Sequence, residues 1–171
     1  ETGGEAEKVA LRQERNALQD KLADQYEAAS KYYIKASARA TKSGEPAAAA
    51  DYMVKAGDLA MSKGDQRMAL ECWRRVMLNN PRHEAAQERI VSLLLEYSEL
   101  YGGDVSDLQS QAELLVAEDF APNNVLGLRA LGHALVENPA SSVEDIKRGG
   151  EYLEKAFQLD KSNPKTAASL A

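Results

Sequence analysis

Residues 50–81 constrain the fold more than any other part of the chain, because they read as two amphipathic helices joined by a tight turn. On either side of Gly64 and Asp65, small and apolar residues recur every three or four positions, which is the spacing of one helical face. Trp73 is expected to fill the space between the two helices, and Pro81 to end the second, because proline cannot continue the hydrogen-bond ladder. The small residues that allow close helix approach are Ala56, Gly57, Ala60 and Ala69.

Residues 34–45 repeat the pattern of residues 54–65 at an offset of twenty residues. In both stretches a helical segment is followed by a turn at a glycine, Gly44 in the first and Gly64 in the second. One helix plus one turn is therefore the repeating unit, and successive helices are expected to stack antiparallel.

The hairpin of residues 50–81 resembles a tetratricopeptide repeat in its small residues, its Gly-Asp turn, its aromatic residue and its terminal proline. Met53 stands where that family usually has an aromatic residue. Residues 124–163 carry a second resemblance, through Leu131-Gly132 and the ending LEKAFQLDKSNP. The resemblance implies an all-α, antiparallel helical-hairpin solenoid, a superhelix of the tetratricopeptide type, with a long N-terminal helix.

The chain is expected to contain three parts. Residues 1–3 are interpreted as a scar of an expression vector, left after removal of a secretion signal. Residues 4–30 form a helical lead-in, and residues 31–171 form the array. The array's hairpins are expected at about 31–62, overlapping 50–81, then 83–122 and 124–163, followed by a partial last helix from Asn163 and Pro164.

The lead-in helix has a weak heptad seam. Leu11 and Leu18 lie seven residues apart, but Arg15 and Gln25 place polar groups at seam positions, and Tyr32 is the only bulky seam residue of the second half. Two interpretations stay open. Either the helix pairs with a second copy as a coiled coil, or it is a solvated lead-in that folds back on the repeats or frays.

The later helices have predicted faces and caps. Residues 83–101 are expected to bury one face, and residues 105–121 to form the next helix, capped by Asp104 or by Ser106 with Gln109 after Gly102-Gly103. Ser141 and Glu144 have the same capping-box spacing for the helix that runs to Phe157. The residues predicted on the buried face of 83–101 are Ile90, Leu93, Leu94, Tyr97 and Leu100.

Charge is distributed unevenly along the chain. Residues 31–82 contain ten Lys or Arg and five Asp or Glu, a balance of +5 in a chain whose net charge is −6. Lys31, Lys35, Arg39 and Lys42 lie on a single stripe of one helix, which we call the basic strip. The strip is either a solubilising outer face, with Glu27 pairing Lys31, or a surface that steers an acidic peptide or tail.

The sequence offers little catalytic chemistry. It lacks phosphate-binding glycine loops, HExxH and CxxC, and its two histidines lie fifty residues apart, so we expect no catalytic residues, no metal and no cofactor. Cys72, the single cysteine, is expected to be packed and inert. Nucleic acid is a poor partner because the chain is acidic and its aromatics are not interleaved with basic residues. No apolar run approaches the ~20 residues that span a bilayer.

The resemblance also implies which residues would line a concave groove, since the first helix of each tetratricopeptide hairpin lines that side. The expected groove residues are Lys31, Ile34, Lys42, Asp51, Val54, Asp58, Met61, Arg129 and His133, together with Lys35 and Arg39 of the basic strip. Val54 and Asp58 stand where a clamp for chaperone tails would need a cation and an amide, so chaperone binding is not inferred.

The function expected from these observations is non-catalytic: a scaffold that holds a peptide or another protein in the groove. Two alternatives remain, a homo-oligomeric assembly element through the N-terminal helix, and a docking or regulatory segment of a larger enzyme. Compartment is unknown; a soluble protein is expected, with a lean toward the cytoplasm, although a native signal could precede the sequence.

Overall fold

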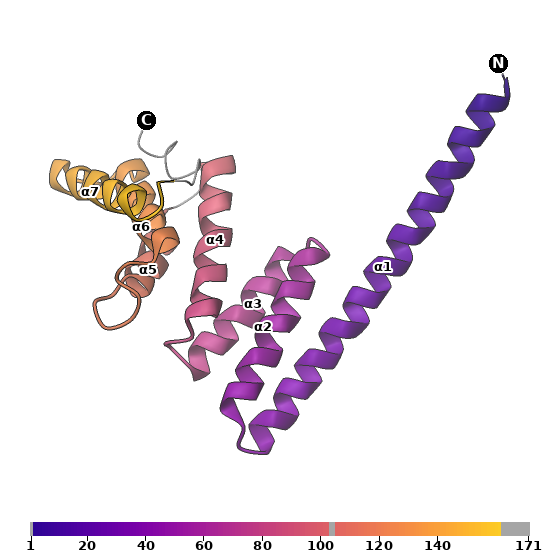
Figure 1. Cartoon of the computed structure of the whole chain (residues 1–171), viewed down its shortest axis with the longest axis horizontal. Coiled ribbons are helices and arrows are strands. Elements are labelled where there is room, and N and C mark those ends of the chain that lie inside the picture. Colours follow the sequence, from indigo (N-terminus) through magenta and orange to yellow (C-terminus); the bar gives the residue numbers. More distant parts are fainter. Residues whose placement is uncertain (1, 103–104, 162–171) are drawn as a thin grey trace. The chain divides into compact units, whose positions relative to one another are not determined.

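A computed structural model of the 171-residue chain describes residues 2–102 and 105–161, and the side chains from residue 8 onward. The described residues form seven α-helices and no strand, which confirms the expected all-α class (Figure 1). The expected helix start at Asn163 and Pro164, and the stop and cap at Gly103 and Asp104, lie outside the described residues. The helices are α1 (Thr2–Lys42), α2 (Pro46–Ser62), α3 (Gln66–Asn79), α4 (Glu84–Tyr101), α5 (Ser106–Leu115), α6 (Val125–Glu137) and α7 (Val143–Leu159).

The chain divides into two compact units, residues 1–79 and 80–171, which we call unit 1 and unit 2. In unit 1, α2 packs against both α1 and α3. Its two turns are built alike: Gly44 (φ 74°) follows α1 and Gly64 (φ 84°) follows α2, in the left-handed region that glycine occupies without steric cost. Pro46 occupies the first turn of α2, where its missing N–H is not needed. The twenty-residue repeat seen in the sequence therefore corresponds to one helix and one glycine turn.

Small residues line the contact between α1 and α2, and two serine hydroxyl groups of α1 form hydrogen bonds to α2. Ser37 donates from Oγ to the Ala49 carbonyl (2.8 Å), and Ser30 donates to the Ala56 carbonyl (3.2 Å). Both bonds are buried, so α1 is fixed in register against α2 over the second half of its length. The first half has no such neighbour, and in Figure 1 it extends beyond the other helices of unit 1. Residues 8–22 of α1 are all exposed, so this part of the lead-in does not pack against α2 or α3, whereas Ser30 at its end does contact α2.

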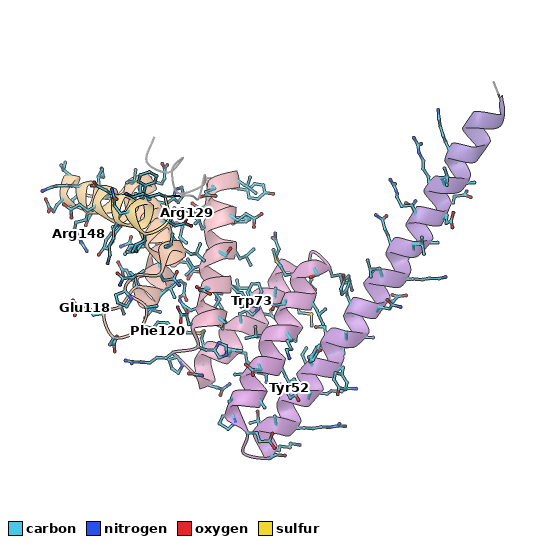
Figure 2. The ribbon with its side chains drawn as sticks, in the orientation of Figure 1. Tyr52, Trp73, Glu118, Phe120, Arg129 and Arg148 are labelled. Carbon is cyan, nitrogen blue, oxygen red and sulfur yellow. The ribbon has the colours of Figure 1, made fainter. Side chains whose placement is uncertain are left out.

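Trp73 is buried between α2 and α3, as the sequence predicts (Figure 2). Its indole lies directly on the α2 backbone at Gly57, where an added Cβ would lie 2.4 Å from Nε1. The same core buries Ala69, Cys72 and Val76 of α3. Burial raises the pKa of the Cys72 thiol, because desolvation disfavours the thiolate.

Unit 2 has a core formed by α4, α5 and α6, which includes Val91, Leu95, Leu108 and Leu131. The buried face of α4 differs from the predicted one. Ile90 and Leu93 are buried and Leu94 is half-buried, but Tyr97 and Leu100 are exposed. The buried face is rotated toward Val91, Leu95 and Ser98, because α5 and α6 both pack on α4.

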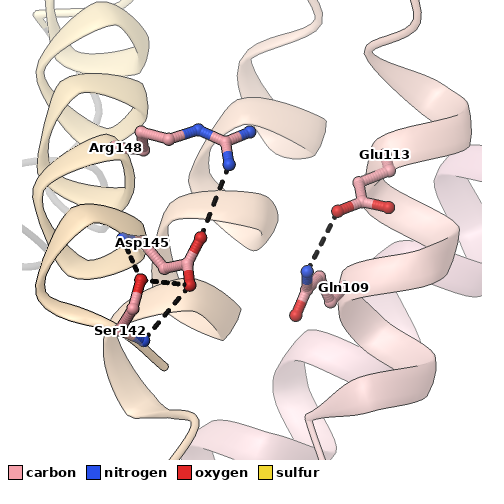
Figure 3. Close-up of polar contacts among 5 residues, drawn as sticks. All are labelled: Gln109, Glu113, Ser142, Asp145 and Arg148. Carbon is pink, nitrogen blue, oxygen red and sulfur yellow. Dashed lines mark hydrogen bonds and ion pairs between the residues drawn. The ribbon is translucent and has the colours of Figure 1, made fainter. Parts of the chain in front are cut away.

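Helix α5 is shorter than predicted, ending at Leu115 rather than near Ala121. Its N-cap is Val105, without a side-chain cap, so the predicted Ser106–Gln109 capping box is wrong. Gln109 instead donates to Glu113, one turn further along α5 (Figure 3).

The first turn of α7 has a capping box one residue later than predicted. Ser142, not Ser141, accepts from the Asp145 backbone N–H, and the Asp145 carboxylate accepts from the Ser142 backbone N–H (Figure 3). These bonds lower the pKa of Asp145, since they stabilise its ionised form. Helices α6 and α7 cross at Gly132 and Gly149, where a Cβ on Gly132 would lie 2.8 Å from the Gly149 carbonyl oxygen.

Candidate binding surface

The outward faces of α1 and α2 form the candidate surface of unit 1. Ser30, Tyr33 and Ser37 contact α2, which places the α2-facing side of α1 along one stripe. At 100° per residue, the basic strip lies roughly opposite that stripe. All four of its side chains, Lys31, Lys35, Arg39 and Lys42, are exposed. The structure therefore places the predicted cations together on the solvent side of α1.

Only the first cation of the basic strip is paired. Lys31 donates to Glu27 at 2.7 Å, one helical turn away, as the sequence predicts. Among the described residues, the structure gives no hydrogen bond or ion pair to the side chains of Lys35, Arg39 or Lys42. Three cations of the strip thus remain available to an anionic partner.

A row of tyrosines runs from Tyr32, at the edge of the basic strip, to α2. Tyr32 meets Tyr33 edge-to-face with ring centroids 5.6 Å apart, and Tyr33 stacks on Tyr52 of α2 at 6.1 Å. The Lys55 ammonium lies 5.9 Å from the Tyr33 ring centroid, within the range of a cation–π contact. We call these four residues the tyrosine row. Tyr32 is exposed, whereas Tyr33 and Tyr52 are half-buried.

Sequence reasoning missed Tyr33, Tyr52 and Lys55. Their proximity depends on the register between α1 and α2, which Ser30 and Ser37 fix through backbone carbonyls on the other helix. The available signal was the pair of tyrosines at residues 33 and 52, close to the twenty-residue repeat.

Glu27 ties α1 to the end of α2. Its second oxygen accepts from Lys63 at 2.8 Å, while the first accepts from Lys31. Hydrogen bonds from Lys31 and then Lys63 lower the pKa of Glu27 to about 2, and the same carboxylate raises the pKa of Lys63. A carboxylate held ionised by two lysines is a poor proton acceptor, so Glu27 is poorly suited to act as a general base.

A small pocket of about 160 Å³ lies around this ion pair. It is bounded by α1, the end of α2 and the start of α3. Apolar side chains and the Glu27–Lys31–Lys63 group line it together, so it has room for one side chain of a partner rather than for a substrate with its cofactor.

The other residues predicted for the groove have different surroundings. On α2, Asp51 is exposed and Asp58 and Met61 are half-buried, but Val54 is only 7% exposed. The expectation that Val54 faces a partner is therefore wrong, because its side chain is packed inside the protein. Ile34 of α1 is half-buried.

Arg129 and His133 both reach from α6 to α4. Arg129 is buried, with Nη2 3.5 Å from Glu99 Oε1, and His133 Nε2 lies 3.1 Å from Ser98 Oγ. Figure 2 labels Arg129, whose Nε has no hydrogen-bond partner among the described groups. These two residues join helices within unit 2 instead of standing free on a surface.

The arrangement of the helices is similar to that of several solved structures. The first TPR domain of the human RPAP3 protein matches with a TM-score of 0.54 at 15% identity, over 71% of this chain and 86% of that domain. MamA from Desulfovibrio magneticus RS-1 (residues 41 to its end) matches with a TM-score of 0.55 at 23% identity, over 83% of this chain and 81% of the other. An ArsTM double mutant of MamA RS-1 gives the same TM-score and coverage at 22% identity.

The chain has a tetratricopeptide-repeat-like fold. This confirms the resemblance inferred from residues 50–81 and 124–163. No protein family and no curated protein matches the sequence itself. At these identities the likeness of the TPR-like chain to solved structures concerns the fold alone.

The described part of the TPR-like chain contains no group of three or more His, Cys, Asp or Glu residues placed to hold a metal ion. Within residues 2–102 and 105–161, no helix combines the length and the hydropathy needed to cross a bilayer. The tyrosine row and the basic strip of unit 1 are the candidate binding surfaces among the described residues.

Proposed function

We propose that this TPR-like chain is a non-catalytic scaffold that binds another protein, and that unit 1 takes an acidic peptide segment of that partner. The proposal rests on one observation: three unpaired cations, Lys35, Arg39 and Lys42, lie beside an exposed tyrosine on a helix held rigidly by α2. The TPR-like fold supports it, since stacked helical hairpins present extended surfaces for peptides.

The chemistry of the surface favours an acidic partner with an apolar or aromatic residue. Lysine and arginine side chains attract carboxylates, and the wheel positions of Tyr32, Lys35 and Arg39 are adjacent on α1. Tyrosine adds apolar contact area at a small cost in side-chain entropy and a hydroxyl for hydrogen bonding. Asp51 of α2 lies on the same helix as Tyr52 and would repel acidic residues, so we expect the peptide to run along α1 rather than across α2.

The proposal is tested with the full chain and a fluorescent peptide that carries glutamates and one aromatic residue. Fluorescence anisotropy should show binding that weakens as salt is added, because screening reduces attraction between exposed charges. The double variant Lys35→Glu with Arg39→Glu should lose most of this binding. A peptide of the same length with lysine in place of glutamate should not bind.

A matched control separates the surface from total charge. Lys147→Glu with Lys161→Glu makes the same change in net charge at exposed sites of unit 2. If that control weakens binding as much as the Lys35/Arg39 variant, the surface is not specific and the proposal fails. Tyr32→Ala provides a second check, since removing an exposed ring should lower affinity while leaving the helical content unchanged.

A further inference from the structure

The first half of α1 carries an apolar seam that nothing in unit 1 covers. Leu11 and Leu18 are each 59% exposed and Leu22 is 48% exposed, and all three lie on one face of the helix. Leu22 lies little more than one helical turn before Glu27. The Glu27 carboxylate forms an ion pair with Lys63 at the end of α2. The seam therefore begins where the support of α2 ends.

Such a helix is poorly stabilised on its own. Residues 8–22 are exposed on every side, and most helical stability in proteins comes from packing of an apolar face. Three leucines at heptad spacing are what a partner helix buries in a coiled coil. In the heptad frame, Leu11 and Leu18 occupy d positions, while Arg15 and Leu22 occupy a positions.

The charges along this half of α1 are complementary when two copies of the helix lie antiparallel. Residues 8–15 carry three cations and one acid, and residues 18–25 carry two acids and one cation. An antiparallel pair therefore brings a segment of +2 against a segment of −1, whereas a parallel pair brings like against like. The charged residues are Lys8, Arg12, Glu14 and Arg15 in the first segment, and Asp20, Lys21 and Asp24 in the second.

We propose that residues 8–25 of α1 pair antiparallel with the same residues of a second copy of this chain. The register sets Leu11 opposite Leu22 of the second copy, and Arg15 opposite Leu18. A parallel pair would instead place Arg15 against Arg15 in the seam, where two like charges lose water without gaining a partner.

The antiparallel register also pairs the flanking charges. Glu14 and Lys21 each precede a seam residue at an a position, so both lie on the same side of the helix. When Leu11 faces Leu22, Glu14 of one copy lies within about 3 Å along the axis of Lys21 of the other, at ~1.5 Å rise per residue. Two-fold symmetry repeats this ion pair. The pairing does not depend on the peptide surface, because the basic strip lies in the other half of α1.

Sedimentation equilibrium of the full chain at several concentrations tests the pairing. We expect a monomer–dimer equilibrium for the native sequence. Leu11→Asn with Leu22→Asn should weaken it by on the order of a hundredfold, because four leucines per dimer lose their burial. Val9→Asn is the matched control: Val9 is 49% exposed but lies off the seam, so dimerisation should be unchanged.

Charge reversal tests the direction of the pair. Glu14→Lys alone and Lys21→Glu alone should each weaken self-association about tenfold, since each replaces two attractions by two repulsions. Mixing the two variants should restore a dimer, because each copy then supplies the charge that the other lacks. Labels on the two variants would report this heterodimer by energy transfer.

Three results overturn the proposal. The native chain could remain monomeric up to its solubility limit, so that another partner or solvent covers the seam. A dimer could persist when Leu11 and Leu22 are replaced. The mixed charge variants could fail to associate although each alone is weakened, which would exclude the antiparallel register.

Discussion

Two hairpins of this chain use a glycine on their first helix for different kinds of packing. In the α2–α3 hairpin, Gly57 leaves room for the indole of Trp73. In the α6–α7 hairpin, Gly132 leaves room for another backbone, at Gly149, with Leu153 beside it. The comparison teaches that one repeat pattern, a small residue facing the second helix, allows either a bulky side chain or a close crossing of helices.

The two contacts should respond differently to mutation. A side chain can be exchanged for a smaller one, but a backbone carbonyl cannot be removed. We therefore expect the destabilisation caused by a larger residue at Gly57 to be relieved by a smaller side chain at Trp73. We expect no second substitution to relieve the destabilisation caused by a larger residue at Gly132.

The largest expected effect is that of Trp73→Ala. Removal of a buried tryptophan side chain should lower the free energy of unfolding by about 3–5 kcal/mol, because a cavity replaces the contacts between α2 and α3. Urea denaturation followed by circular dichroism measures it. Tyr97→Ala is the control, since this exposed aromatic of α4 should change stability little.

Gly132→Ala should be the next most damaging change. The new Cβ would lie 2.6 Å from Leu153 Cγ and 2.8 Å from the Gly149 carbonyl oxygen, and the carbonyl cannot move away without shifting α7. Overpacking of this kind costs about 1–3 kcal/mol. Gly150→Ala, with no atom within 4 Å of its added Cβ, should instead stabilise α7 by about 0.5–1 kcal/mol. Equal effects at the two glycines in thermal denaturation would contradict a close helix crossing.

Gly57→Ala tests whether the α2–α3 contact is made by a side chain. In the native background we expect a loss of about 1–3 kcal/mol, because the Cβ would overlap the indole. In a Trp73→Leu background the same change should be nearly neutral or slightly stabilising, since alanine favours helix over glycine. A double-mutant cycle measures the difference, and an additive result would show that Gly57 is needed for another reason.

The sequence was sufficient for contacts that lie within one hairpin. Gly57, Trp73 and the Gly-Asp turn predicted the α2–α3 hairpin, and Leu131-Gly132 predicted the small-residue face of α6. Those features are local patterns of 3.6-residue periodicity, in which turn residues have their own backbone preferences.

The features that the sequence did not predict depend on register or on small local shifts. The tyrosine row depends on the alignment of α1 with α2. The α7 cap moved from Ser141 to Ser142, although both have an acid three residues later. Helix α5 ends at Leu115 without a nearby glycine or proline to mark the end. Val54 has the wheel position of a groove residue, but its burial is set by neighbours that its own helix does not reveal.

The smallest expected effect concerns Glu27, which joins α1 to α2 through hydrogen bonds instead of packing. Its pKa of about 2 lies below the ordinary 4.5, so the unfolded chain binds a proton more readily than the folded one. The stabilisation is therefore present above pH 4.5 and is lost as the pH falls toward 2. Glu27→Gln should lower the melting temperature slightly at pH 7 and leave it unchanged near pH 2, because the group is exposed and screened. Asp20→Asn, an exposed acid of α1, is the control for total charge. If the melting temperatures of the native chain and of Glu27→Gln still differed at pH 2, the Glu27 side chain would act through its shape rather than its charge. Its role would then resemble that of Trp73, which stabilises the contact between α2 and α3 by packing.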